Sequence, residues 1–106
     1  MLGKNRDRVS IVAAILEVAH SGASKTRIMF GAGLSFSLLG KYLDIVLSAG
    51  FVQNQNYRYH TTERGYEFLK QYKRFEERYL RTQEMLEALD KEHDYLSQLS
   101  ESPRSV

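Results

Sequence analysis

The stretch from Thr62 to about Leu99 constrains the fold more than any other part of this 106-residue chain. It contains no proline, and its one glycine, Gly65, lies in its first turn. Along it, apolar or semi-polar residues recur at alternating steps of four and three, which is the spacing of a coiled-coil seam. The seam positions are Phe68, Tyr72, Phe75, Tyr79, Thr82, Leu86, Leu89, His93 and Leu96. A helix of this length extends about 55 Å, and the other residues are too few to cover it, so we predict a dimer.

The two halves of this seam differ in side-chain size and in charge. The first half is aromatic, and the second half is smaller and mostly aliphatic. Residues 62–81 carry six Lys and Arg against four Asp and Glu, whereas residues 82–106 carry two against six. An antiparallel pair sets large side chains against small ones and basic segments against acidic ones. We therefore predict an antiparallel homodimer; the alternative is a long helix that folds back onto its own domain.

Composition excludes several kinds of site. Without cysteine, the chain can form no disulfide, zinc-thiolate site or cysteine nucleophile. The three histidines show no metal-ligand spacing, and His93 is expected to set the register of the seam. No motif pairs a nucleophile with a base, and no glycine-rich loop suits a phosphate. We expect neither an enzyme nor a protein with a metal, a cofactor or a small-molecule substrate.

The distribution of charge and apolar residues also indicates the partner. No apolar run approaches membrane-spanning length, and the N-terminus lacks a secretory segment, so we expect a soluble cytoplasmic protein with no membrane partner. Residues 1–81 carry 13 Lys and Arg against 7 Asp and Glu, which is a mild bias toward nucleic acid. Residues 1–7, with Lys4 and Arg6, are expected to form a basic N-terminal arm.

Helical apolar periodicity predicts three helices before residue 50. Their ranges are 8–20, 25–30 and 36–49. Ser24 and Ser35 are the expected N-caps of the second and third helices, and Leu34 is a buried residue in the turn between them. The third helix has an inward stripe and a slim outward stripe. The inward residues are Leu38, Leu39, Tyr42, Leu43, Val46 and Leu47, and the outward residues are Ser37, Gly40, Lys41, Asp44 and Ser48.

Two β-prone runs, 51–54 and 57–61, flank the dipeptide Gln55-Asn56 and predict a hairpin. Tyr57 and Tyr59 share a strand face with Thr61 and are expected to pack on the core. Thr62 or Thr61 is the expected cap of the long helix. The order helix, short helix, helix, hairpin and long helix is that of a winged helix-turn-helix domain. The fold class is therefore mainly α with a small β-hairpin wing.

Five short stretches carry a resemblance to a known family. They are Lys25–Phe30 with Leu34-Ser35, Lys41–Leu43, Gly50–Val52, Tyr57–Tyr59 and Thr62–Leu69. Together they resemble small archaeal DNA-binding winged-helix proteins, in particular the roughly ten-kilodalton chromatin-associated members, which dimerise through an antiparallel coiled coil of their last helices. The resemblance runs from about residue 8 to residue 75 by motif and to about residue 99 by architecture. It implies a two-headed, nucleoid-associated DNA-binding dimer with an architectural or regulatory role.

Nine residues are candidates for contact with double-stranded DNA: Lys25, Thr26, Arg27, Ser35, Ser37, Lys41, Asn54, Asn56 and Arg58. Cations in the first turn of a helix oppose its dipole, so their presence favours phosphate contact. The wing amides and Arg58 favour width-sensitive contact in the minor groove. Gly40 stands where a larger residue would read bases, so we expect mainly phosphate contacts.

The predicted organisation is a basic arm at 1–7, a winged domain at 8–66, a dimerisation helix at 67–99 and a flexible tail at 100–106. The recognition helix spans about 35–49 and the wing about 51–61. Two alternatives remain open: a sequence-specific transcriptional repressor, and a winged-helix protein-interaction module that does not bind DNA directly.

Overall fold

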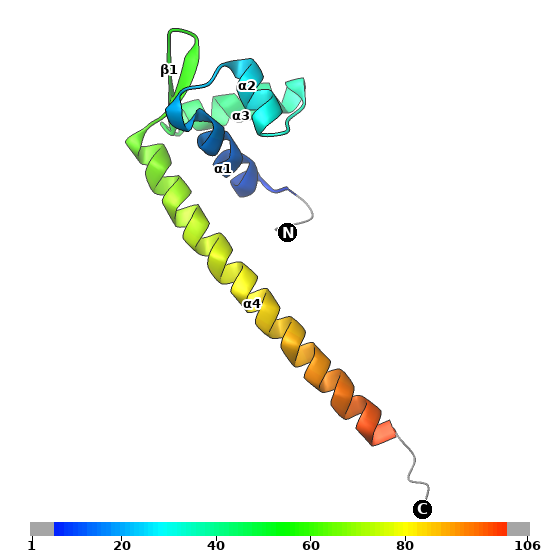
Figure 1. Cartoon of the computed structure of the whole chain (residues 1–106). Coiled ribbons are helices and arrows are strands. Elements are labelled where there is room, and N and C mark those ends of the chain that lie inside the picture. The colour runs from blue at the N-terminus through cyan, green and yellow to red at the C-terminus, as the bar shows by residue number, and fades with distance from the viewer. Residues whose placement is uncertain (1–5, 102–106) are drawn as a thin grey trace, which may run out of the picture. The chain divides into compact units, whose positions relative to one another are not determined.

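The computed structural model describes residues 6–101 (Figure 1). In chain order its elements are α1 (Arg8–Val18), the 3-10 turn η1 (Ala19–Ser21), α2 (Lys25–Gly31), α3 (Phe36–Ser48), β1 (Val52–Gln55), β2 (Arg58–Thr61) and α4 (Glu63–Glu101). The two strands form an antiparallel sheet. This order confirms the predicted mainly helical fold with a hairpin wing and a long last helix.

The chain divides into two units, whose boundary falls inside α4 between Lys73 and Arg74. The first unit holds α1 to β2 and the first turns of α4. The second unit is the rest of α4, which continues to Glu101. Ser100 and Glu101 are therefore helical rather than part of a tail as predicted, and residues 102–106 lie outside the described residues. As functional divisions, the ranges predicted from the sequence stay predictions.

Hydroxyl side chains begin three of the helices. Each accepts a hydrogen bond from a backbone N–H three residues later, which satisfies a donor that a helix leaves unpaired. The pairs are Ser24 with Arg27 at 3.2 Å, Ser35 with Leu38 at 3.2 Å and Thr62 with Gly65 at 3.1 Å. These contacts confirm the predicted caps and select Thr62 over Thr61. The hydroxyl of Thr61 is instead buried and donates to the carbonyl oxygen of Leu16 at 2.8 Å.

The described part of the N-terminal segment contacts the domain. Asp7 caps α1, where its carboxylate accepts a hydrogen bond from the backbone N–H of Ser10 at 2.9 Å. This hydrogen bond holds the pKa of the Asp7 carboxyl below its usual value. The neighbouring Arg6 donates from Nη1 to the carbonyl oxygen of Gly33 at 3.3 Å. Of the predicted basic arm, Lys4 lies outside the described residues.

The core of the first unit is apolar and draws on every element of that unit. Ile15, Leu16, Ile28 and Val46 are its largest fully buried side chains. From α3 it takes the stripe Leu39, Tyr42, Leu43 and Val46. Contrary to prediction, Leu38 and Leu47 are 40% and 38% exposed. Both lie about 80–100° around the helix from the centre of that stripe, at roughly 100° per residue, so they flank the buried face.

The hairpin turn lies one residue later than predicted. Gln55 pairs with Arg58 across the strands, so the turn consists of Asn56 and Tyr57. Their φ angles are +54° and +64°, which is the conformation of a type I′ turn. Tyr57 is therefore outside the strand and 91% exposed, and the prediction that it packs on the core was wrong. Tyr59 is buried as predicted.

Helices α2 and α3 are bent by 108°, which lies within the range of helix-turn-helix motifs. Gly33, with φ of +66°, lies in the turn, and Leu34 is buried there as predicted.

Among the described residues, no single helix is both long and apolar enough to cross a membrane. Together α2 and α3 reach that length and composition, but the bend separates them.

Candidate nucleic-acid interface

A two-sided backbone bridge attaches the wing to the segment before α2. The N–H of Ala23 donates to the carbonyl oxygen of Tyr59 at 3.0 Å, and the N–H of Tyr59 donates back at 2.8 Å. This bridge places β2 beside the start of α2. Arg58, the residue before the bridge, donates from Nη1 to the carbonyl oxygen of Gly22 at 3.5 Å. The wing cation is thereby brought to the end of α2 that carries Lys25 and Arg27.

The three candidates at the start of α2 are exposed. Lys25, Thr26 and Arg27 form its first turn, after the N-cap Ser24. The positive end of the helix dipole and two cations coincide there, and this arrangement is unfavourable without an anion. The threonine hydroxyl and the backbone N–H groups of a first turn suit a phosphate oxygen. This end of α2 is thus suited to an anionic partner.

The exposed face of α3 is polar and sparse. Ser37, Lys41 and Asp44 are all exposed along it, and Lys41 Nζ lies 5.6 Å from the centre of the Tyr42 ring. A Cβ atom added at Gly40 would meet no heavy atom within 4 Å. Ser35 uses its oxygen to cap the helix, and its hydroxyl proton is still able to donate to a phosphate. The exposed face of α3 therefore presents one cation, Lys41, one anion, Asp44, and the uncovered backbone at Gly40.

Four cations on α2, α3 and the wing, here called the head-group cations, differ in their pairing from three of the cations of α4. The ion pairs of α4 link Lys70 to Glu67, Lys73 to Glu17 and Arg81 to Glu77. In the described part of the chain, no carboxylate lies within ion-pair distance of the head-group cations, which are Lys25, Arg27, Lys41 and Arg58. Among residues 6–101, these four cations therefore add positive charge to α2, α3 and the wing that no ion pair offsets.

Two exposed aromatic residues on these elements were missed by the sequence reasoning. Phe36, the first residue of α3, is 82% exposed, and Tyr57 at the wing tip is 91% exposed. The exposure of Phe36 was predictable from the sequence, because this residue directly follows the N-cap and precedes the buried stripe of α3. The exposure of Tyr57 was not predicted, because the turn was placed one residue too early and Tyr57 was assigned to a strand. Asn54 on β1 and Asn56 in the turn are exposed as expected of wing residues.

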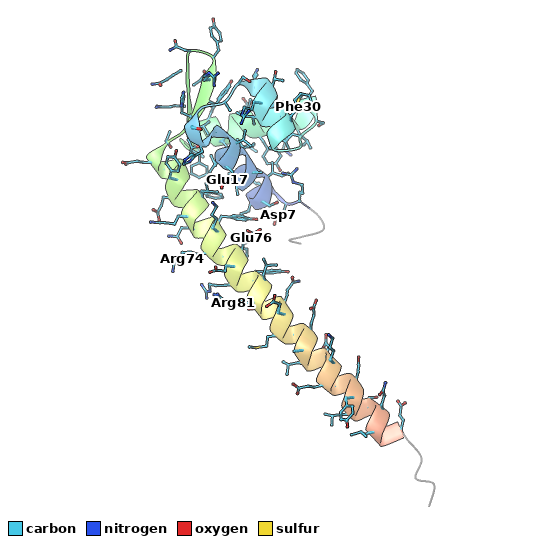
Figure 2. All side chains as sticks on the ribbon, in the orientation of Figure 1. Asp7, Glu17, Phe30, Arg74, Glu76 and Arg81 are labelled. Atoms are coloured by element: carbon cyan, nitrogen blue, oxygen red, sulfur yellow. The ribbon has the colours of Figure 1, made fainter. Side chains whose placement is uncertain are left out.

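A groove of about 1170 Å³ lies on the first unit between α1, α2 and the first turns of α4, and two of the candidate residues, Thr26 and Arg27, line it. Figure 2 shows Phe30 on α2, and this residue, 75% exposed, lines the groove. Across it, Lys73 Nζ lies 2.7 Å from Glu17 Oε2. No group of three or more His, Asp or Glu residues that could hold a metal ion occurs among residues 6–101.

The predicted seam residues on α4 fall into two groups. Phe68 and Tyr72 pack partly against the core of the first unit, and the ring centres of Phe68 and Phe51 are 4.9 Å apart. These two residues therefore already have packing roles within one chain. In the second unit Phe75, Leu86, Leu89 and Leu96 are each between 51% and 61% exposed. Their part in a dimer, like that of Tyr79, Thr82 and His93, stays a prediction.

The comparisons with known proteins agree with this geometry. The chain matches the winged helix-turn-helix family over residues 5–79. It is 33% identical over 61 residues to the uncharacterized protein MJ0287 of Methanocaldococcus jannaschii; the match covers 57% of this chain and 63% of that protein, less than two thirds of its length. The fold is similar to the crystal structure of Sso10a-2, a DNA-binding protein from Sulfolobus solfataricus, with a TM-score of 0.65 and 25% identity, covering 86% of this chain and 96% of that one. These findings confirm the resemblance to small archaeal winged-helix proteins. The chain belongs to the winged helix-turn-helix family.

Proposed function

We propose that this chain binds double-stranded DNA as a dimer, in an architectural or transcription-regulatory role. In this proposal α3 is the recognition helix and the β1–β2 hairpin is the wing. The observation that carries it is the set of four exposed cations on α2, α3 and the wing that have no carboxylate partner within residues 6–101. Family membership supports a binding protein rather than an enzyme, and the structural relative Sso10a-2 is itself described as DNA-binding.

Phosphate contact dominates the proposed binding mode. A helix that reads bases needs several side chains able to pair with base edges in the major groove. The exposed face of α3 offers only Lys41 and Asp44 as charged side chains near the open backbone at Gly40, and a carboxylate repels phosphates. The hydroxyl groups of Thr26, Ser35 and Ser37 are donors suited to phosphate oxygens. The proposal is therefore a sequence-tolerant protein, with salt-dependent affinity and a small specificity ratio.

Replacing Lys25, Arg27, Lys41 and Arg58 together by glutamine tests this proposal. Each lost phosphate contact lowers the slope of log affinity against log salt by about 0.9, so the slope should fall by between three and four. At about 0.1 M salt the affinity for a mixed-sequence duplex should fall on the order of a thousandfold. Fluorescence anisotropy titrations at several salt concentrations measure both quantities.

The matched control neutralises the same number of cations on α4, namely Lys70, Lys73, Arg81 and Lys91. Three of these already lie in exposed ion pairs, each of which contributes about 1 kcal/mol or less. The control should keep most of the affinity and slope. Unchanged binding in the first variant would instead support a protein-interaction module. A wild-type affinity that is at least about a thousandfold higher for one sequence would support a sequence-specific repressor.

The proposed dimer pairs the α4 helices of two chains in antiparallel orientation. In the dimer each α4 covers apolar surface that is about half exposed on the other α4. Each Å² of apolar surface removed from water contributes about 25 cal/mol to the free energy of association. The predicted overlap from Phe68 to His93 is about 38 Å long. The two half-sites read by a compact palindrome-binding dimer lie about 34 Å apart. Winged domains placed beyond the two ends of such an overlap lie farther apart than that, so they suit separated or bent DNA, or two duplexes. Electron microscopy that shows single dimers on one straight duplex, without bridging, would contradict that geometry.

A further inference from the structure

Tyr57 has a backbone conformation that its side chain does not favour. It is the second residue of the two-residue hairpin turn, with φ of +64°. A bulky residue at positive φ is an outlier, because its Cβ crowds the backbone. The turn type prefers glycine at this position, and Asn-Gly is its most favoured sequence. Asn56 fits the first turn position well, whereas Tyr57 stands where glycine would be easier.

Packing within the chain does not account for this tyrosine. Its side chain is 91% exposed, the largest exposed fraction among the large apolar residues described. The aromatic pairs found in residues 6–101 involve other rings, including those of His20 with Tyr66 and Phe51 with Phe68. A strained and exposed aromatic residue at a protruding tip gains nothing for the folded chain itself. The contact that favours the tyrosine is therefore expected outside the chain.

The surroundings of Tyr57 indicate the chemistry of that contact. The exposed amides of Asn54 and Asn56 and the guanidinium of Arg58 belong to the same hairpin. The minor groove is about 6 Å wide and presents the acceptors adenine N3 and thymine O2. A phenol ring is thin enough to lie between its sugar walls, and its hydroxyl can donate to those acceptors. The guanine amino group would obstruct it.

We propose that Tyr57 is a specificity-determining residue that enters the DNA minor groove and favours A·T over G·C pairs there. The proposal rests on the DNA-binding function proposed above and adds a groove, a residue and a base preference to it. It also accounts for a bulky residue at a turn position with positive φ, where glycine would be easier.

Three duplexes of equal length test the groove directly. They contain A·T pairs, G·C pairs or inosine·cytosine pairs at their centre. Inosine lacks the guanine amino group, so the inosine·cytosine duplex has the minor groove of A·T. Its major-groove acceptors are those of G·C. The wild-type chain should bind the A·T and inosine duplexes about tenfold more tightly than the G·C duplex. Tyr57→Gly should lose about tenfold on the first two and little on the third. Tyr57→Phe should keep affinity from its ring and lose part of the A·T preference.

Two further measurements separate this role from a structural one. Because glycine suits the turn, Tyr57→Gly should unfold at the same or a higher denaturant concentration than the wild type while binding DNA more weakly. The salt slope should not change, because no charge is removed. Tyr95→Ala, which removes a 62% exposed ring from α4, is the matched control and should leave all three affinities unchanged.

The outcomes are distinct. Binding of the A·T duplex by Tyr57→Gly within about twofold of the wild type would overturn the inference and leave the proposed function standing. An equal loss on all three duplexes would also overturn it, because minor-groove chemistry would then not matter. A wild-type chain with no salt-dependent affinity for any duplex would overturn the proposed function together with the inference.

Discussion

Gly65→Ala is expected to lower the free energy of unfolding by about 3 kcal/mol. A Cβ atom at this position would overlap the carbonyl oxygen of Phe51 and lie 2.8 Å from Cγ2 of Thr61. That carbonyl also accepts a hydrogen bond from the N–H of Thr62 at 2.9 Å, so it cannot move without loosening the start of α4. The clash is with backbone rather than with a flexible side chain, and the wing and α4 must separate to relieve it. Denaturant unfolding at a fixed chain concentration measures the change.

Gly40→Ala is the matched control, because the same methyl group is added to a helix. Nothing lies within 4 Å of the new Cβ at Gly40. Alanine is preferred over glycine inside a helix by about 1 kcal/mol, so this variant should be more stable than the wild type by about that amount. Opposite signs for the two variants are the expected result. Equal stability of the Gly65 variant and the wild type would contradict the close packing of α4 against the hairpin.

Local signals in the sequence were sufficient to predict most of the fold. The N-caps of α2, α3 and α4 are hydroxyl residues whose capping contacts lie within three positions along the chain, so local sequence is sufficient to predict them. Ser24 and Ser35 were predicted in this way, and Thr62 was one of two predicted caps for the long helix. The heptad pattern predicted one uninterrupted helix, and α4 is continuous over 39 residues.

The errors arose where pairing between distant segments decides the structure. The turn was misplaced because β-propensity assigned Tyr57 to a strand, whereas cross-strand pairing of Gln55 with Arg58 fixes the register. Leu38 and Leu47 were assigned to the core because they are apolar, although the buried stripe of α3 is narrower. The contact of Phe68 with Phe51 was not predictable from heptad spacing, because both a seam and a domain core favour the same apolar residues.

For the candidate interface, the sequence predicted residue types but not their assembly. Lys25 was chosen as a cation in the first turn of a helix, and Arg58 as a cation on the wing. The backbone bridge between Ala23 and Tyr59, which no periodicity marks, holds the wing beside the segment before α2. The absence of carboxylate partners for the four cations, among the described residues, is likewise a property of the folded chain. It separates them from Lys73, which a composition argument treats identically but which pairs with Glu17.

Leu86→Asp combined with Leu89→Asp is expected to convert the proposed dimer to monomers. Both leucines are more than half exposed in the single chain, so the substitution leaves the core of the first unit intact. In the antiparallel register they face Phe75 and Tyr72 of the second chain, and each buried leucine contributes about 1.5–3 kcal/mol. A dimer that engages long DNA through both of its winged domains binds about a hundredfold to ten-thousandfold more tightly than one winged domain alone. The double variant should lose that factor, while its affinity for a short duplex occupied by one head stays within about threefold of the wild type.

The matched control places the same two charges on the outer surface of α4, as Leu80→Asp with Tyr95→Asp. These residues are 51% and 62% exposed and lie off the predicted seam, so the control should remain dimeric by sedimentation equilibrium. Orientation is tested in a chain that carries cysteine at both 75 and 86, since the natural chain has none. Antiparallel helices link 75 of one chain to 86 of the other, whereas parallel helices link like positions. Peptide mapping that finds only like-to-like disulfides would contradict the antiparallel dimer, and monomeric wild-type protein at micromolar concentration would contradict the seam itself.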